Sequence, residues 1–309
     1  MTTNKPYYPV ICFGEVLWDM LPAGKQPGGA PMNVAYHLCK LGKNTAVISR
    51  IGCDEPGNEL LDVWKSRSIN TSFFQLDKNI STGKVYARAG NDHEMHYDVV
   101  KPAAWDCIQW KEEYNCLVSQ AEYFVFGSLA ARSSESKAAL FKCMEAAQTK
   151  VLDINLRAPH FNRENVETLL SKANILKLNQ AELQLVAGWY GHFESDEERV
   201  GWLSQRFGHN MVIVTKGGNG AMLLAGGRFY HHPGFPVTVA DTIGSGDAFL
   251  AGFLAGLLDH KSYDDMLLQA SAMGAFIASK TGACPQYSLA DISGFCCLKS
   301  NQASIFQSI

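Results

Sequence analysis

The nine residues Asp241–Phe249 read DTIGSGDAF and run into the most apolar segment of the chain, Ala248–Leu258. Gly244 and Gly246 permit backbone conformations and close approaches that a Cβ atom would block. Because Ala248–Leu258 reads as a buried helix, the N–H groups of the turn before it would lie at the positive end of the helix dipole. Such a concavity suits an anion such as phosphate. The stretch therefore predicts an anion-binding cradle at the start of a core helix.

Asp247 falls in the first turn of this predicted helix, directly after the small residues Gly244, Ser245 and Gly246. The helix dipole and the nearby N–H groups favour the charged form, so we expect the carboxylate to stay ionised. A carboxylate beside an anion cradle has a chemical use if it takes a proton from an attacking hydroxyl. Asp247 is therefore the candidate catalytic base, and the three residues before it form the candidate anion site. A simple capping aspartate is the alternative.

Outward from this stretch, short β-branched or aromatic runs alternate with helical patterns. Apolar strands separated by helices imply a mostly parallel sheet with helices on both faces, so we predict a three-layer α/β fold. Small residues along one stripe of the core helix, including Gly252 and Gly256, would let it lie close to that sheet. The predicted strands are Val10–Phe13, Thr45–Ile51, Tyr123–Phe126, Val151–Ile154, Ile175–Leu178 and Met211–Val214. The predicted helices are Met32–Leu41, Glu59–Arg67, Ser134–Ala147, Glu164–Leu170 and Glu197–Arg206.

The segment Thr82–Val100 interrupts this rhythm with alternating apolar and polar residues around the turn residues Gly90–Asp92. The pattern predicts a β-hairpin with one covered face. In an α/β chain such a hairpin is suited to cover an active site, although a sheet-edge hairpin without function is the alternative. We therefore expect one domain over residues 1–309, with a small β lid formed by segments of about 15–27 and 82–103.

The composition narrows the functional classes. The net charge of −3 leaves no basic footprint for nucleic acid, and a chain that is 47% hydrophobic and 18% charged is ordinary for a globular protein. The nine cysteines include no CxxC pair, which is typical of reduced thiols in a cytosolic protein. Met1–Tyr8 lacks the apolar core of a signal peptide, and Ala248–Leu258 is too short to span a bilayer. We therefore expect a cytoplasmic protein that binds neither nucleic acid nor membranes.

Common phosphate and hydrolase motifs are absent from the sequence. Neither Gly42-Lys43 nor Gly83-Lys84 has the glycine spacing or the following Ser/Thr of a Walker A loop. The protein kinase motifs and HExxH are missing, and Gly244-Ser245-Gly246 is not a GxSxG elbow. The predicted phosphate chemistry must therefore be organised differently from these groups.

Four motifs, in this order, resemble the signatures of the PfkB carbohydrate kinases, the ribokinase-like family. They are Gly28–Ala35, which matches the N-terminal signature, Asn179–Glu182, which matches N-x-x-E, Thr215–Gly220, which is similar to the T-x-G-x-x-G nucleotide loop, and Asp241–Asp247, which matches D-T-x-G-x-G-D. The resemblance extends from Val10 to about Pro285. The GGAPxNVA form of the first motif and the GExxxDxxP segment Gly14–Pro22 look most like fructokinases.

The resemblance implies a ribokinase-like fold and transfer of the γ-phosphoryl group of ATP to a sugar hydroxyl. It implies that Asp247 is the base and that the amides of Gly244, Ser245 and Gly246 hold the transferred group. The implied sugar contacts are Asp19, Gly28, Gly29 and Asn33. The implied nucleotide site comprises Thr215, Gly217 and Gly220, with Asn179 and Glu182 organising Mg²⁺, partly through water, and the triphosphate.

Without a Walker lysine, the charge that develops on the transferred group needs other cations. Lys177 precedes Asn179 on a predicted strand, and Arg157 lies at the carboxyl edge of another strand, where α/β sheets place their ligands. Both are candidates for phosphate or substrate contacts, with plain surface charges as the alternative. The resemblance further implies a K⁺ site near Asp241 and the loop Lys280–Ala283.

The identity of the acceptor is taken from the same resemblance. D-fructose, converted to fructose 6-phosphate, is the first hypothesis. Ribose, a nucleoside and 2-keto-3-deoxygluconate stay open, and a keto acid would need a cation such as Arg88 or Arg157. A catalytically silent sugar-binding protein is the alternative from another class, which the presence of Asp247 disfavours. Apolar residues on the outer face of the lid would allow a homodimer, as in relatives.

Overall fold

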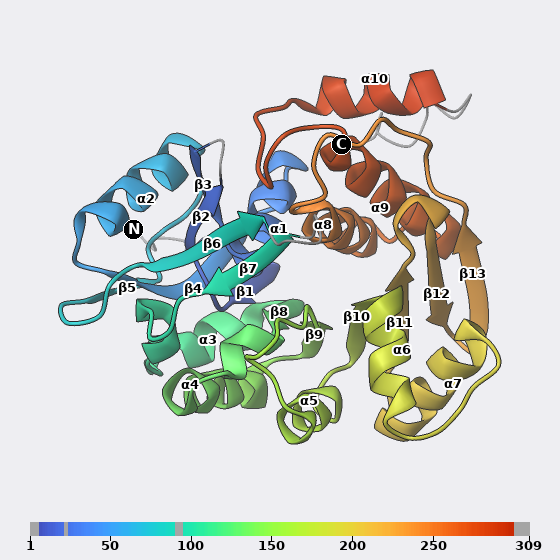
Figure 1. Cartoon of the computed structure of the whole chain (residues 1–309), viewed down its shortest axis with the longest axis horizontal. Coiled ribbons are helices and arrows are strands. Elements are labelled where there is room, and N and C mark those ends of the chain that lie inside the picture. The colour runs from blue at the N-terminus through green and yellow to red at the C-terminus, as the bar shows by residue number, and fades with distance from the viewer. Residues whose placement is uncertain (1–5, 22–23, 90–94, 300–309) are drawn as a thin grey trace, which may run out of the picture.

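The computed structural model describes residues 6–21, 24–89 and 95–299, and its centre is a nine-stranded sheet (Figure 1). The strand order is β13-β12-β11-β10-β9-β8-β1-β4-β5. The six pairs from β11 to β5 are parallel, whereas β12 and β13 join as antiparallel strands. The strands are β1 (Val10–Phe13), β4 (Thr45–Gly52), β5 (Phe74–Asp77), β8 (Tyr123–Gly127), β9 (Thr149–Asp153), β10 (Ile175–Asn179), β11 (Met211–Thr215), β12 (Ala221–Ala225) and β13 (Arg228–His232). The mostly parallel sheet confirms the predicted fold class.

Side chains of the central strands enter two hydrophobic cores, one on each face of the sheet. In β1, Val10 and Cys12 belong to one core, and Ile11 and Phe13 belong to the other. Because successive side chains of a strand point to opposite faces, a strand buried on both faces is apolar throughout. Helices cover each face, so the predicted three layers are confirmed (Figure 1).

The first core is covered by α1 (Ala30–Lys40), α2 (Glu55–Ser66), α8 (Ser245–Leu258), α9 (Tyr263–Ala278) and α10 (Leu289–Lys299). The second core is covered by α3 (Glu113–Gln120), α4 (Ser134–Ala146), α5 (Arg163–Leu170), α6 (Gln180–Gly188) and α7 (Asp196–Phe207). The five helices predicted from the sequence pattern correspond to α1, α2, α4, α5 and α7. The predicted core helix corresponds to α8.

The glycines of α8 face another helix. A Cβ atom on Gly252 would lie 3.0 Å from Cα of Ala270, and one on Gly256 would lie 2.9 Å from Cγ of Met266. Both neighbours belong to α9. For Gly252 and Gly256, the expectation that the small stripe brings α8 close to the sheet is therefore wrong, because these two positions bring α8 close to α9. This contact fixes the helix whose N-terminus forms the predicted anion cradle.

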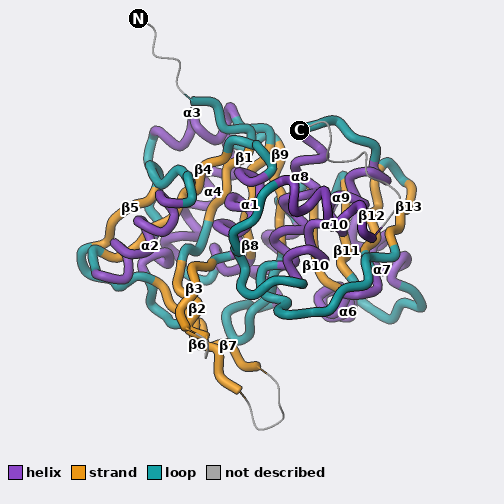
Figure 2. Tube along the Cα trace, turned by 90° about the horizontal axis from the view of Figure 1, so that it is seen from above, coloured by secondary structure: helices purple, strands orange, loops and turns teal. Residues whose placement is uncertain are grey.

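A second sheet of four strands, in the order β3-β2-β6-β7, projects from the body of the molecule (Figure 2). Its strands are β2 (Leu17–Leu21), β3 (Gly24–Gly28), β6 (Gly83–Ala89) and β7 (Met95–Val99). The antiparallel pairing of β6 with β7 confirms the predicted hairpin. On one face of this small sheet Asp19 borders a cavity, and on the other the indole N–H of Trp18 donates to the carbonyl of Pro56 in α2 at 2.9 Å.

Two further findings concern the chain as a whole. Within the described ranges, the helices are either too short or too polar to cross a membrane. The seven cysteines whose side chains are described are free thiols, and Cys12, Cys143 and Cys284 are buried. Burial raises the pKa of Cys143 to about 12, which keeps its thiol protonated and unreactive.

Candidate active site

A cavity of about 500 Å³ opens where the carboxyl ends of β9 and β10, the N-terminus of α8 and the small sheet meet. Open α/β sheets bind their ligands at this edge. The cavity brings together most residues named from the sequence: Asp19, Gly29, Asn33, Arg157, Lys177, Asn179, Glu182, Thr215, Gly217, Gly244, Ser245, Gly246 and Asp247. Gly220 lines a neighbouring cavity of about 180 Å³. Gly28 and Asp241 lie behind the walls and line neither cavity.

Asp247 lies in the first turn of α8, as predicted. Its Oδ2 accepts a hydrogen bond from Nδ2 of Asn33 at 2.8 Å. Burial and the negative charge of Asp153 raise the pKa of Asp247 to about 6, although Asn33, Lys177 and Arg157 act in the opposite direction. The expectation that the helix dipole and the nearby N–H groups keep the carboxylate ionised is therefore incomplete, because burial and Asp153 act in the opposite direction. The structure places a carboxylate there that is more basic than an ordinary aspartate and still ionised at pH 7.

The turn before Asp247 requires glycine. Gly244 is the N-cap of α8 with φ 76°, a left-handed conformation. A Cβ atom there would also lie 2.6 Å from Cα of Ala283. The Ser245 hydroxyl donates to the carbonyl of Thr242 at 2.8 Å and so closes the turn. The N–H of Ser245 donates to the carbonyl of Thr242 at 3.3 Å. Because first-turn N–H groups of a helix lack intrahelical acceptors, those of Gly246 and Asp247 can face an anion in the cavity.

Lys177 supplies a positive charge beside this turn. A Cβ atom on Gly246 would lie 3.4 Å from its Nζ, and Nζ is 2.7 Å from Oδ2 of Asp153. Burial, the largest influence, lowers the pKa of Lys177, but the adjacent Asp153 carboxylate, together with the charges of Asp247 and Glu182, raises it on balance. The alternative of a plain surface charge is wrong for Lys177, because only 5% of the residue is exposed.

Arg157 differs from Lys177 in its surroundings. It follows β9 in the loop at the carboxyl edge, is exposed, and donates from Nη1 to its neighbour Leu156 at 3.1 Å. It borders the cavity, and its charge lowers the pKa of both Asp19 and Asp247 relative to burial alone. Arg157 is therefore a cation at the rim of the site.

Asp19 and Asn33 approach the cavity from β2 and α1. Burial, followed by the charge of Asp247, raises the pKa of Asp19 to about 7. The Asp19 carboxylate lies directly against Gly28, since a Cβ atom at Gly28 would lie 2.1 Å from Oδ2 of Asp19. Gly29 has φ 111°, and a Cβ atom there would lie 2.3 Å from the carbonyl oxygen of Glu15. Gly28 therefore leaves room for the Asp19 side chain, and Gly29 leaves room for the backbone that follows β1.

Asn179 and Glu182 form a capping box at the start of α6, the structural role that the sequence analysis allowed beside a functional one. Oε2 of Glu182 accepts from the backbone N–H of Asn179, and Oε1 accepts from that of Leu156, both at 2.8 Å. Burial raises the pKa of Glu182. Among the residues that the structure describes, His, Cys, Asp and Glu side chains form no group of three that could hold a metal alone. Mg²⁺ fits here as a companion of phosphates, since it commonly keeps several waters and uses one or two carboxylates.

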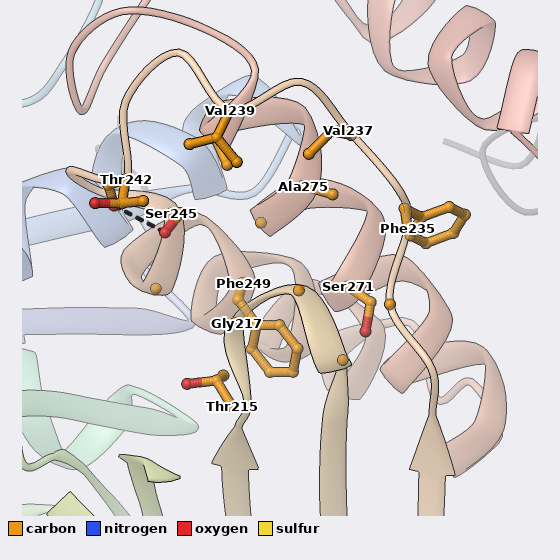
Figure 3. A pocket seen from close by; sticks show the side chains of 16 residues that line it. Thr215, Gly217, Phe235, Val237, Val239, Thr242, Ser245, Phe249, Ser271 and Ala275 are labelled. Atoms are coloured by element: carbon orange, nitrogen blue, oxygen red, sulfur yellow. Dashed lines mark hydrogen bonds between the residues drawn. The ribbon is translucent and has the colours of Figure 1, made fainter. Parts of the chain in front are cut away.

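The smaller cavity continues from the anion cradle toward α9 (Figure 3). Its walls are mostly apolar, with Val237, Val239, Phe249 and Ala275 around it. Gly220 has φ 82°, and a Cβ atom there would collide with the carbonyl of His232, so glycine allows the chain to pass this wall. An apolar slot that ends at an anion cradle is suited to a flat base joined to phosphates.

Comparison with known proteins places this arrangement in a family. Residues 11–289 match the family model for pfkB family carbohydrate kinases. The chain belongs to this family. It is thus an ATP-dependent sugar kinase, as the four motifs predicted.

The relatives agree with this placement. "Probable fructokinase-7" of Arabidopsis thaliana is 28% identical over 313 residues, which cover 89% of this chain and 88% of that protein. The fructokinase of Xylella fastidiosa, solved with bound ATP, has a TM-score of 0.82 at 23% identity and covers 94% of this chain and 98% of its own. That of Vibrio cholerae O395, solved with fructose, ADP and calcium ion, has a TM-score of 0.80 at 23% identity, covering 93% and 98%. The fold is therefore that of these kinases.

In this pfkB chain, Asp241 holds the cradle to a second loop. Its Oδ1 accepts from the N–H of Ile243 at 2.9 Å, and its Oδ2 accepts from that of Gly282 at 3.1 Å. The turn and the loop named for a K⁺ site therefore lie side by side. The side chain of Asp241 acts as the tie between them.

Two acidic residues of the site were not assigned a role from the sequence. Asp153 ends β9 and pairs with Lys177, and an acidic residue at the carboxyl end of a parallel strand is a signal that could have identified it. Glu15 follows β1, is 2% exposed, and accepts from the N–H of Ala30 at 3.1 Å. Burial raises the pKa of Glu15 to about 7. The GE pair before Asp19 was noted only as part of a family pattern.

Proposed function

We propose that this pfkB kinase is a fructokinase, which transfers the γ-phosphoryl group of ATP to the 6-hydroxyl of D-fructose. The observation that carries the proposal is the position of Asp247, in the first turn of α8, with its carboxylate bonded to the amide of Asn33. A hydroxyl at this position reaches the base while the phosphoryl donor faces the cradle. The relatives named fructokinase, and the neighbour solved with fructose and ADP, support the choice of sugar.

In the proposed reaction the 6-hydroxyl gives its proton to Asp247 while its oxygen attacks the γ-phosphorus. The bond from the γ-phosphorus to the oxygen that bridges the β-phosphate breaks, so ADP leaves and fructose 6-phosphate forms. Asp247 suits this role because burial raises its pKa to about 6, which makes it a stronger base that is still ionised at pH 7. The N–H groups of the α8 N-terminus and the ammonium of Lys177 stabilise the charge on the transferred group.

The sugar is held, in this proposal, by Asp19 and Asn33. A carboxylate and an amide each bond neighbouring hydroxyls, the carboxylate as acceptor and the amide as both donor and acceptor. Leu17, Val85 and Val99 line the same side of the cavity and offer an apolar surface to the carbon face of the ring. The small sheet that carries Asp19 is the proposed lid, because its inner face borders the site while the remainder of the fold holds the catalytic groups.

The nucleotide occupies the smaller cavity in this proposal, with Thr215, Gly217 and Gly220 along it. Mg²⁺ accompanies the triphosphate, where it supplies positive charge to the phosphate oxygens. In this proposal Asn179 and Glu182 would hold it through water, since the carboxylate oxygens of Glu182 already accept backbone hydrogen bonds. K⁺ near Asp241 and the 280–283 loop remains part of the proposal, supported by the contact between these segments.

A homodimer through the lid stays a prediction. Trp18, on the face of the small sheet away from the cavity, packs against α2 of the same chain. Met20 and Tyr86 are half-buried residues of the small sheet. Light scattering would measure the mass directly: about twice that of the chain supports the dimer, and a single-chain mass contradicts it.

The test of the substrate is a coupled ADP-release assay over fructose, ribose, 2-keto-3-deoxygluconate and a nucleoside. We expect the highest kcat/KM for fructose. A keto acid substrate would need a cation at its carboxylate; Arg157 stands at the rim, and the side chain of Arg88 lies outside the described residues. Turnover of another acceptor with none of fructose would reject the sugar but keep the kinase. Unchanged turnover by Asp247→Asn would reject the base.

A further inference from the structure

The thiol of Cys284 is linked to the catalytic base through one amide. Its Sγ donates to Oδ1 of Asn33 at 3.2 Å, and Nδ2 of Asn33 donates to Oδ2 of Asp247 at 2.8 Å. Cys284 is 6% exposed and Asn33 is 4% exposed, so water does not compete freely for these bonds. The three side chains come from the loop after α9, from α1 and from α8, and they meet only in the folded chain.

The orientation of the Asn33 amide follows from its two neighbours. A thiol is a weak donor, and an ionised carboxylate is only an acceptor. The amide oxygen therefore faces Cys284, and the amide N–H group faces Asp247. After a flip by 180° the amide oxygen would face the Asp247 carboxylate, which is repulsive, and the thiol would lose its acceptor.

Two side chains of α1, together with Arg67, which directly follows α2, fix the loop that carries Cys284. Three successive carbonyls of this loop each accept a hydrogen bond: that of Ala283 from Nε2 of His37 at 3.0 Å, that of Cys284 from Nη1 of Arg67 at 2.8 Å, and that of Pro285 from the hydroxyl of Tyr36 at 2.6 Å. Burial lowers the pKa of His37 to about 4, so the ring is neutral. Its Nε2 carries the proton, and its Nδ1 accepts from the hydroxyl of Tyr287 at 2.8 Å. The thiol is thus held in place by its backbone on both sides.

We propose that Cys284 is a positioning residue for the phosphoryl transfer, because its thiol fixes the Asn33 amide in the orientation that donates to Asp247. This inference rests on the proposed role of Asp247 as the base. Cys284 itself does not touch the substrate in this scheme. It acts through Asn33 on the direction and the basicity of the Asp247 carboxylate.

Other charged groups also face Asp247, so the effect of Asn33 has to be measured against a fixed background. The charged or titratable groups that influence its ionisation, or are influenced by it, are Glu15, Asp19, Asp153, Arg157, Lys177 and the Cys284 thiol itself. None of the others contacts Cys284 through a described hydrogen bond, since its thiol bonds to Asn33 and its carbonyl to Arg67. Among the described hydrogen bonds, a substitution at position 284 therefore reaches the base by way of Asn33.

The experiment compares Cys284→Ala, which removes the donor, with Cys284→Ser, which keeps one. Cys143→Ala is the matched control, a buried thiol in α4. The pH dependence of kcat is measured with ATP and fructose. In Cys284→Ala we expect kcat at high pH to fall roughly threefold or more. We also expect the pH at which kcat falls on the acid side to rise by roughly half a unit, because Asn33 donates less firmly to Asp247 and the pKa of that carboxyl group rises. Cys284→Ser should recover most of both effects, and Cys143→Ala should move neither.

A second measurement does not need activity. Urea unfolding of Cys284→Ala, Asn33→Ala and the double variant gives a mutant cycle, in which contacting residues are expected to be non-additive. We expect the double variant to lose less than the sum of the two single losses. An unshifted acid limb in Cys284→Ala, or strict additivity in the cycle, would overturn the inference. Full turnover by Asp247→Asn would instead overturn the proposed base, so the two failures are distinguishable.

Discussion

Removing the ammonium of Lys177 tests the charge balance of the site most directly. Its Nζ is 2.7 Å from Oδ2 of Asp153, and the two side chains are 6% and 8% exposed. Lys177→Met keeps an apolar stem but leaves the Asp153 carboxylate buried beside Glu182 and Asp247. Breaking one partner of a buried pair costs about 3–5 kcal/mol. Since domains are stable by only about 5–15 kcal/mol, we expect a large drop in the free energy of unfolding.

The assay separates stability from catalysis. Unfolding in urea, followed by tryptophan fluorescence at pH 7, gives the stability, and ADP release gives the activity. The double variant Lys177→Met with Asp153→Asn removes both charges, so it should recover much of the stability. It should not recover turnover, because the cation beside Gly246 is still missing. Arg163→Met is the control, since the Arg163–Glu167 pair is exposed and should leave the unfolding midpoint close to wild type.

Two results would refute this reasoning. A loss below about 1 kcal/mol for Lys177→Met would mean that the pair behaves like one at the surface. Recovery of full turnover in the double variant would mean that Lys177 supports the site only by neutralising Asp153. In that case the N-terminus of α8 would carry the stabilisation of the transferred group without this cation.

Three further predictions address the base, the cradle and the sugar site. Burial raises the pKa of Asp247 to about 6, so its carboxylate loses its charge as the pH falls. We therefore expect kcat to decrease on the acid side with a midpoint near pH 6. A kcat that stays constant between about pH 5 and 8 would contradict this. Gly244→Ala should lower kcat by roughly a hundredfold or more. Residue 244 has a positive φ, and a Cβ atom there would lie 2.6 Å from Cα of Ala283. Gly188→Ala is the control, because a Cβ atom at position 188 meets open space, and this variant should behave as wild type in the same assay. Asp19→Asn should raise KM for the sugar while KM for ATP stays unchanged; equal changes in both constants would place Asp19 outside the sugar site.

The sequence predicted the fold wherever burial leaves a local pattern. The six strands predicted from the sequence are mostly apolar because both of their faces are covered, and their ends were located within two residues. The parallel edge strand β5 was not predicted, because its sequence, FQLD, is half polar and only partly buried. β12 and β13 were missed, although Gly226-Gly227 between them has φ of 55° and 75°, the positive values of a two-residue hairpin turn. The packing of Gly252 and Gly256 against α9 could not be read locally, because a small stripe does not say which neighbour it approaches.

The sequence allowed us to predict which residues form the site, but not the surroundings of each side chain. Asp247 and the glycines before it were identified because their chemistry is contiguous in the chain. The raised pKa of Asp247 was not, since it depends first on burial and then on Asp153, which arrives from another strand. The hydrogen bond from Cys284 to Asn33 joins segments near opposite ends of the chain, and no sequence pattern around either residue predicts it.

The two cavities share part of their walls, and this has a thermodynamic consequence. The shared residues are Thr215, Gly217, Thr242, Ser245 and Gly246. A ligand in one cavity that orders these shared residues also changes the surface that a ligand in the other cavity contacts. By linkage, the factor by which the nucleotide changes the affinity for the acceptor must equal the factor by which the acceptor changes the affinity for the nucleotide. Calorimetric titrations in both orders should therefore give the same coupling free energy, whichever compound is added first.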